Sequence, residues 1–316
     1  MQPVQPKPED YKYDLDRALT SVLAIKTIIP ADAFTAETLG TERTGSGVLI
    51  RGDGLVLTIG YLVTEAEAVW MSYGSGRVAA GHVLAYDQET GFGLVQALAR
   101  LELPALALGN SAEATVGDDV VIAGAGGRQR SLAARIIAKQ EFSGYWEYVL
   151  DEAIFTAPAH PNWGGTAVIG AAGDLIGIGS LQIQQAAGAR RLEDANMIVP
   201  IDLLKPILQD LLTLGRRNKP PRPWLGIYAT EVGSTVAVFG LTNRGPAKDA
   251  DLRAGDIILG VGGSSVNDLA GLFRRVWALG SAGVDVPLLI NRGGTTFEMR
   301  IRSADRRAFL KGPVLH

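Results

Sequence analysis

Few residues of this chain could act in catalysis, because histidine is scarce and cysteine is absent. The 316 residues include no cysteine and three histidines, His82, His160 and His316. Without a thiolate, a nucleophile would have to be a hydroxyl activated by a base, which is most often histidine. The same scarcity argues against a zinc site or another metal centre, so we expect no metal and no cofactor.

The run Pro161-Asn162-Trp163-Gly164-Gly165 is the next segment of interest. An indole N–H is a donor without a basic lone pair, so Trp163 cannot attack a carbonyl. A working base at His160 or His82 would need a hydroxyl in hydrogen-bond reach and a third group to orient it. We expect both histidines to be surface or packing residues, and Thr166 to be a strand-entry residue.

The composition describes a globular chain of about two domains. Apolar residues make up 47% and charged residues 20%, and the 39 glycines favour turns and short strands. The net charge of −3 shows no basic excess for nucleic acid, and no cationic amphipathic stretch suggests a membrane surface. Residues 1–6 do not resemble a secretory leader, so we expect either a cytoplasmic chain or a periplasmic one whose leader was removed.

The apolar pattern predicts the elements that would position these residues. The first dozen residues are expected to form a flexible extension, and apolar residues three and four apart predict a helix over 15–29. Between 45 and 183, short apolar runs broken by Gly, Asp and Asn predict an all-β barrel or sandwich. An amphipathic helix is expected over 200–214.

The charged, proline-rich run Arg216–Pro223 predicts an extended, solvated linker to a second unit. In this unit Asn291-Arg292-Gly293-Gly294 is a strong hairpin signal, and residues 269–279 are expected to be helical. The expected strands cover residues 236–239, 256–261, 284–290 and 295–301. The second unit is therefore a β-rich module with one clear helix.

Taken in order, the segments of the chain resemble a known family. Thr44-Gly45-Ser46-Gly47-Val48, residues 86–90 and Asn162-Trp163-Gly164-Gly165 are similar to the HtrA (DegP-type) serine protease domain, and Trp224-Leu225-Gly226-Ile227 to the PDZ domain that follows it. The resemblance implies an all-β, chymotrypsin-like double barrel followed by a small β-rich α+β PDZ domain. The implied parts are an N-terminal extension and helix (1–43), the barrels (44–214), a linker (215–222), the PDZ domain (223–305) and a tail (306–316).

The resemblance also implies that the catalytic positions are degenerate. Histidine, aspartate and serine act in that chain order, and the matching positions here are Tyr61, Gly91 and Trp163. A tyrosine of ordinary pKa is a poor base near neutral pH, and glycine offers nothing to orient one. Pro161 falls where a glycine N–H would form half of the oxyanion hole, and losing one such donor typically costs on the order of 100- to 1,000-fold in rate. Asp87 lies in the turn before Gly91 and is not expected to replace the aspartate.

The leading hypothesis is a catalytically inactive HtrA-like protein, a pseudoprotease in protein quality control, that acts as a scaffold, regulator or chaperone-like factor. The alternative is an active serine endopeptidase that uses displaced residues. Trp163 would either fill the vacated cleft or offer an apolar platform to a partner.

The partners are implied by the resemblance as well. The PDZ domain would bind the C-terminus of a peptide or protein at Trp224, Leu225, Gly226, Ile227 and Tyr228, where loop N–H groups capture the carboxylate and the sheet edge pairs with the peptide. A PDZ-like module used only for packing is the other possibility. A homotrimer held by N-terminal aromatic residues is also implied, and Tyr11 and Tyr13 lie in that region.

Overall fold

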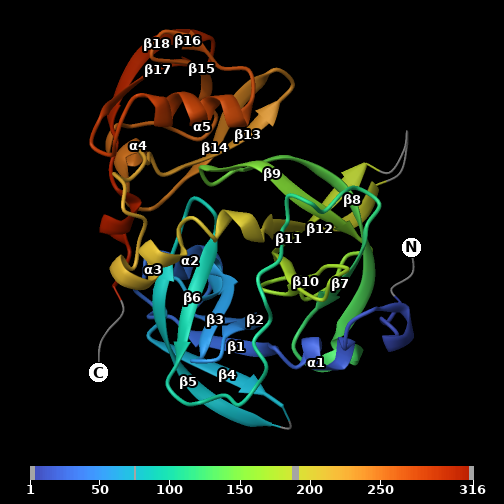
Figure 1. Ribbon diagram of the computed structural model, residues 1–316. Coiled ribbons are helices and arrows are strands. Elements are labelled where there is room, and N and C mark those ends of the chain that lie inside the picture. Colours follow the sequence, from blue (N-terminus) through green and yellow to red (C-terminus); the bar gives the residue numbers. More distant parts are fainter. Residues whose placement is uncertain (1–3, 75, 187–191, 313–316) are drawn as a thin grey trace. The chain divides into compact units, whose positions relative to one another are not determined.

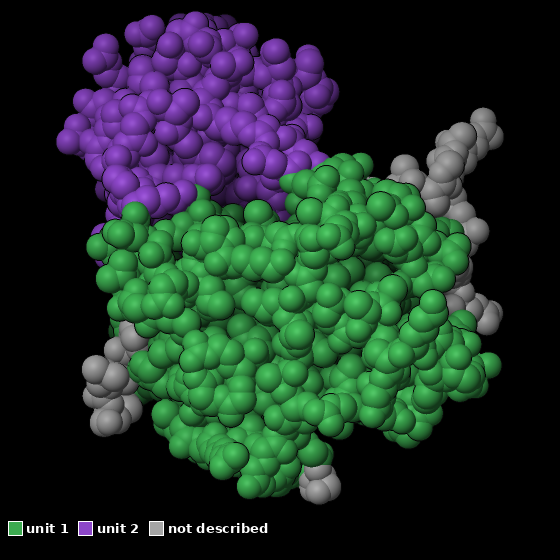
Figure 2. All heavy atoms as spheres, viewed as in Figure 1, with its two compact units in different colours: residues 1–140, 152–218, 311–316 green, residues 141–151, 219–310 purple. Residues whose placement is uncertain are grey.

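The computed structural model describes residues 4–74, 76–186 and 192–312 (Figure 1). His316, the end of the expected tail and residues 1–3 of the expected extension lie outside the described residues. The chain divides into two compact units, coloured in Figure 2: residues 1–140, 152–218 and 311–316 form unit 1, and residues 141–151 and 219–310 form unit 2. None of the described helices is long and apolar enough to cross a membrane.

The first barrel of unit 1 begins earlier than expected. A helix does start at Leu15, but α1 ends at Leu19, and residues 22–28 form a strand, so the helix expected over 15–29 is wrong beyond its first turn. The β-branched residues of this segment favour the strand, and their burial alternates with exposed Lys26 and Ile28. The barrel closes in the order β1 (Val22–Ile28), β2 (Glu42–Arg51), β3 (Leu55–Ile59), β6 (Phe92–Ala97), β5 (Arg77–Tyr86) and β4 (Ala68–Tyr73).

The second barrel of unit 1 has its own apolar core, which includes Ile122, Ile136, Ile154 and Ile198. Its strands close in the order β10 (Ala167–Ile169), β11 (Leu175–Ala186), β12 (Leu192–Pro200), β9 (Tyr148–Ala157), β8 (Ser131–Gly144) and β7 (Asp119–Ala123). Two closed barrels confirm the expected all-β double barrel.

Short helical elements connect these strands. The helix expected over 200–214 is split into η4 (Ile201–Leu203) and α3 (Leu208–Leu214), since Pro206 lacks an N–H and disfavours a helical conformation before it. The N-terminal extension is not free, because the backbone of Val4 forms a bridge with Ala133. The remaining short elements are η1 (Pro8–Asp10), α2 (Ala36–Leu39), η2 (Gly60–Leu62) and η3 (Gly127–Arg130).

Unit 2 is a strand-rich module with one longer helix, as expected. Its sheet has the order β13 (Ile227–Val232), β14 (Thr235–Leu241), β15 (Ile257–Val261), β17 (Asp285–Arg292) and β18 (Thr295–Arg302), and β16 (Ser264–Ser265) pairs with β15. Its helices are α4 (Pro246–Asp249), α5 (Leu269–Ala278) and η5 (Arg306–Phe309).

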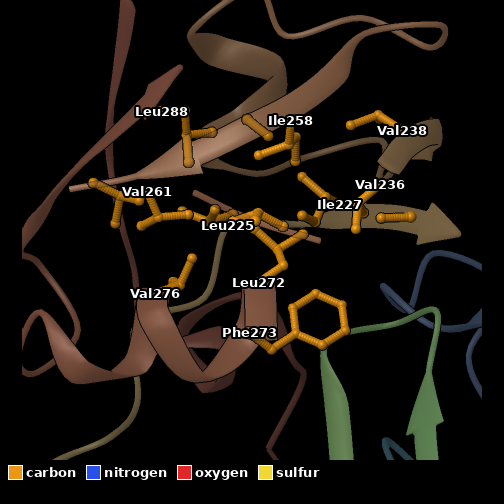
Figure 3. Packing of buried hydrophobic residues seen from close by; sticks show 14 of the residues in the cluster. Leu225, Ile227, Val236, Val238, Ile258, Val261, Leu272, Phe273, Val276 and Leu288 are labelled. Carbon is orange, nitrogen blue, oxygen red and sulfur yellow. The ribbon is translucent and has the colours of Figure 1, made fainter. Parts of the chain in front are cut away.

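The core of unit 2 lies between α5 and the sheet. Figure 3 shows Leu272 and Phe273 of α5 beside Leu225, Ile227 and Ile258 of the sheet and its entry loop. Residues 141–151, which we call the hairpin tip, are the end of β8, the turn 145–147 and the start of β9, and they belong to this unit. Val149 of the hairpin tip is part of the same core, which the sequence did not indicate.

Candidate functional site

Tyr61 lies on η2, directly after β3, and is anchored at both ends. Its carbonyl oxygen accepts a hydrogen bond of 2.7 Å from the buried Arg43 guanidinium, which also binds the carbonyl of Thr64. Its hydroxyl donates to the carbonyl oxygen of Ser180 at 2.9 Å. The phenol therefore has a fixed direction.

Trp163 lies in the loop after β9, half-buried, and its side chain is hydrogen-bonded to Tyr61. Because the indole is a donor only, its N–H donates to the phenol oxygen. Gly164 permits this arrangement, since a Cβ at that position would lie 2.7 Å from the Tyr61 hydroxyl oxygen. Burial raises the pKa of Tyr61 above its ordinary value, and the bond with Trp163 offsets only part of the rise. The phenol is thus a still weaker base than free tyrosine.

Gly91 completes this group of expected positions. Its carbonyl oxygen accepts a 2.6 Å hydrogen bond from the N–H of Gly60, the residue before Tyr61. Its φ of +84° lies in the region that favours glycine. The structure therefore brings Tyr61, Gly91 and Trp163 together. We call them, with the exposed Pro161, the barrel site.

His160 is next to the barrel site, but its ring is fully used by the backbone. Its Nδ1 accepts from the N–H of Asn162 at 3.1 Å, so the proton is on Nε2, which lies 2.9 Å from the carbonyl oxygen of Arg130. Asn196 holds the His160 backbone through a 2.6 Å bond. Burial lowers the pKa of His160, which keeps the ring neutral. The residue has the packing role expected of it.

The other residues considered as displaced catalytic groups are also placed. His82 lies on β5 opposite Gln96, and no hydroxyl or carboxylate among the described residues hydrogen-bonds its ring. The Thr166 hydroxyl donates to the carbonyl oxygen of Trp163 at 2.9 Å, so it supports the loop.

Asp87 is a structural carboxylate. It accepts from the N–H and hydroxyl of Thr90 at 2.9 and 2.6 Å, which closes the turn before Gly91. Arg217 binds both of its oxygens, at 2.8 and 2.7 Å. Sequence reasoning treated Arg217 as part of a solvated linker and missed this pair, because the partner lies far away in the chain.

The predicted peptide-binding residues, 224–228, form the entry to β13, and we call them the carboxylate loop. The N–H groups of Leu225, Gly226 and Ile227 converge on one point. The φ of Gly226 is +81°, and a Cβ there would lie 2.5 Å from the Thr242 hydroxyl, so glycine is required. The point of convergence holds the side-chain carboxylate of Glu147, a residue that the sequence did not single out.

Two further expectations concern metals and oligomers. Among the residues that the structure describes, no group of three or more His, Asp or Glu side chains could hold a metal ion. Tyr11 and Tyr13 are half-buried and in ring contact, with centroids 5.4 Å apart.

Comparison with known families agrees with this architecture. Residues 45–178 match the model of the trypsin-like peptidase domain, and residues 223–302 match that of the PDZ domain. The chain is an HtrA-like, trypsin-fold protein with a C-terminal PDZ domain. The expected fold class is therefore confirmed.

Relatives of this HtrA-like chain include named proteases. The serine protease Do-like HtrA of Lactobacillus helveticus is 23% identical over 84% of this chain and 69% of its own. A probable periplasmic DegP-like serine endoprotease of Halomonas elongata is 27% identical over 79% of this chain and 54% of its own. The periplasmic pH-dependent serine endoprotease DegQ of Escherichia coli is 27% identical over 82% of this chain and 59% of its own. The HtrA-like chain thus spans a little over half the length of the last two.

Solved structures support the fold. The HtrA-type protease AlgW with a decapeptide has a TM-score of 0.56 and 20% identity, over 95% of this chain and 98% of that one. A serine endoprotease from Yersinia pestis has a TM-score of 0.51 and 20% identity, over 92% of this chain and 95% of that one.

Proposed function

We propose that this HtrA-like chain binds peptides or proteins without cleaving them, as a scaffold, regulator or chaperone-like factor. The observation that carries the proposal is the hydrogen-bonded pair of Tyr61 and Trp163. Tyr61 lies at the expected position of the base and Trp163 at that of the nucleophile. The Tyr61 hydroxyl donates to the Ser180 carbonyl, and the Trp163 N–H donates to the Tyr61 hydroxyl. A nucleophilic mechanism needs a base that can take a proton and a nucleophile that can lose one.

The surroundings of the barrel site support the same proposal. Gly91 has no side chain to orient a base, and Pro161 has no N–H for an oxyanion. Both ring nitrogens of His160 are engaged with the backbone, so this histidine cannot take the place of a base without breaking the loop.

Proteolysis assays test the loss of activity. Purified chain is expected to leave unfolded casein intact and to take up no serine-directed fluorophosphonate probe. The variant Trp163→Ala, which removes the indole, is expected to behave in the same way. Casein cleavage that survives Trp163→Ala and is stopped by the probe would show a displaced catalytic serine and refute the proposal.

Binding is proposed for the carboxylate loop. Three convergent N–H groups suit a C-terminal carboxylate, and β13 is at the edge of its sheet, where an extended peptide can pair. Calorimetry with a panel of peptides that have apolar C-terminal residues tests this part. Failure of every peptide to bind at millimolar concentration contradicts it.

Assembly and location are further parts of the proposal. We propose a homotrimer in which the region of Tyr11 and Tyr13 takes part, and light scattering that gives a monomer refutes it. DegQ and the DegP-like relative are named as periplasmic, which makes the periplasm the first compartment to test by cell fractionation.

A further inference from the structure

The carboxylate loop already binds a carboxylate, and it comes from the chain itself. One oxygen of Glu147 accepts from Gly226 at 2.7 Å and from Ile227 at 3.1 Å, and the other accepts from Leu225 at 3.0 Å. Glu147 is 5% exposed, so its carboxylate has exchanged water for these donors. The backbone groups expected to receive a peptide terminus are therefore all in use.

The backbone of the hairpin tip also contacts β13. The N–H of Ala229 donates to the carbonyl oxygen of Tyr145 at 3.1 Å. Ile227 and Ala229 are two residues apart on β13, as Glu147 and Tyr145 are on the hairpin tip, and they meet in opposite order. The two segments therefore run in opposite directions here, but residues 145–147 form a turn, and the contact with Ile227 is made by the Glu147 side chain. The Glu147 carboxylate thus reaches the carboxylate loop beside the sheet edge with which an extended peptide would pair.

The backbone conformation of Glu147 is unusual and fits this role. Its φ is +61°, in a region that residues with a side chain rarely adopt. Such a conformation persists where surrounding contacts determine it. The chain continues into β9 directly after Glu147, so a side chain, rather than a chain terminus, enters the carboxylate loop.

Further contacts hold the hairpin tip on both sides of Glu147. The Tyr145 ring packs edge-on against Tyr228 of β13 and Phe239 of β14, with centroids 5.8 and 5.5 Å apart. Val149 is buried in the core of unit 2. At the base of the hairpin tip, Arg274 of α5 pairs with Glu141 and Asp151, each at 2.5 Å. The hairpin tip is therefore bound to both the strand and the helix of this module.

We infer that residues 141–151 are an internal ligand of the carboxylate loop, and that an external peptide binds only by displacing Glu147. The competition with an external peptide rests on the proposed peptide-binding function. The occupation of the loop by Glu147 does not depend on it. A competitor that belongs to the same chain acts at a high effective concentration. It lowers the apparent affinity for an external peptide, because the peptide binds only to the fraction of molecules whose carboxylate loop is free. The external ligand must carry a free terminal carboxylate, because that group has to replace the Glu147 carboxylate on three N–H donors.

Amide hydrogen exchange in the full chain tests the occupied loop directly. Glu147→Ala removes the acceptor, and exchange at Leu225, Gly226 and Ile227 is expected to rise about tenfold or more. Glu147→Gln keeps the shape and one neutral acceptor, so it should give a smaller rise, and it carries the test if the alanine variant does not fold. Glu298→Ala, at an exposed carboxylate of β18, is the matched control and should change nothing there. Equal exchange in all four chains overturns the internal ligand.

Titration with an apolar C-terminal peptide and its C-terminal amide tests the competition. The acid peptide is expected to bind Glu147→Ala about tenfold or more tightly than the unchanged chain, and the amide should bind neither. Equal affinity for both chains overturns the competition. If exchange at the loop rises in Glu147→Ala but no peptide binds, the proposed peptide-binding function fails, while the internal ligand stands.

Discussion

The barrel site and the carboxylate loop of this chain are both occupied by its own side chains, but in different ways. At the barrel site, the aromatic residues Tyr61 and Trp163 lie at the expected positions of the reactive groups and bind each other. At the carboxylate loop, the three N–H donors are present and Glu147 rests on them. In the proposed function, the first site lacks its chemistry because of these substitutions, whereas the second keeps its donors and is covered.

The two sites therefore differ in whether a movement of the chain can restore their chemistry. A covered site can be uncovered, because displacing the hairpin tip returns three backbone donors to solvent. A substituted site cannot be recovered by movement, since no motion gives Gly91 a carboxylate or Pro161 an N–H. We therefore expect changes of pH and substitutions to alter peptide binding at the carboxylate loop. At the barrel site, we expect substitutions to alter only the free energy of unfolding.

The largest effect is expected at Asp87, the buried carboxylate in the turn before Gly91. Asp87→Ala leaves the Arg217 guanidinium, 19% exposed, without its bidentate partner. The free energy of unfolding of unit 1 should fall by about 2–3 kcal/mol, as measured by urea denaturation. The control Asp53→Ala breaks a surface pair with Arg51 and should change it by less than about 1 kcal/mol. Equal losses in the two variants would contradict a structural role for Asp87.

The next effect concerns the bond inside the barrel site. Tyr61→Phe removes both the donor to Ser180 and the acceptor for the Trp163 indole. Two polar groups are then left partly buried, and the free energy of unfolding should fall by about 1–2 kcal/mol. Tyr73→Phe is the matched control, because its ring stays under the Arg77 guanidinium. If Tyr61→Phe is as stable as the control, the pair does not stabilise the loop.

A pH dependence of peptide binding is expected at the carboxylate loop. Burial raises the pKa of Glu147 to about 7, although the three N–H groups and the charge of Arg306 on η5 act in the opposite direction. The docked hairpin tip therefore holds a proton more tightly than the released one, whose pKa is near the ordinary 4.5. Docking is strongest below the ordinary pKa and weakens as the pH rises through about 7.

The affinity for an acid peptide should consequently increase by about tenfold between pH 5 and pH 7. Fluorescence polarisation with a labelled peptide measures this change. In Glu147→Gln the side chain does not titrate, so the increase should be absent. A rise of the same size in Glu147→Gln would assign the pH dependence to another group.

No effect on proteolysis is expected from placing a serine at position 163 alone. Trp163→Ser supplies a hydroxyl but leaves Tyr61, Gly91 and Pro161 in place, so the serine has no base and half of the oxyanion hole is missing. Casein should remain intact by gel and by mass spectrometry. Measurable cleavage by Trp163→Ser would show that the barrel site still holds a working base.

Local signals in the sequence predicted much of the fold. The turn Asn291–Gly294 joins β17 to β18 as expected, and residues 269–278 form α5, capped by the Asp268 carboxylate. Residues 22–28 were assigned wrongly, because apolar residues spaced for one helix face also fit a barrel strand. Pro206 divided a helix that its apolar spacing alone predicted to be continuous.

The sites were predicted less completely, for a physical reason. Tyr61, Gly91 and Trp163 were predicted from the order of motifs, and nothing in the sequence indicated that the phenol and indole bind each other. Glu147 gave no local signal at all, since its donors lie 78 to 80 residues further along the chain. Its positive φ and its burial are properties of the folded chain only.

Binding without cleavage is the central claim, and one titration tests it most directly. An apolar C-terminal peptide is titrated into the Glu147→Ala chain, and the peptide is then recovered and weighed by mass spectrometry. We predict saturable binding that is tighter than to the unchanged chain, with every recovered peptide intact. Recovery of cleaved peptide, or affinities that are equal in the two chains, would contradict the account.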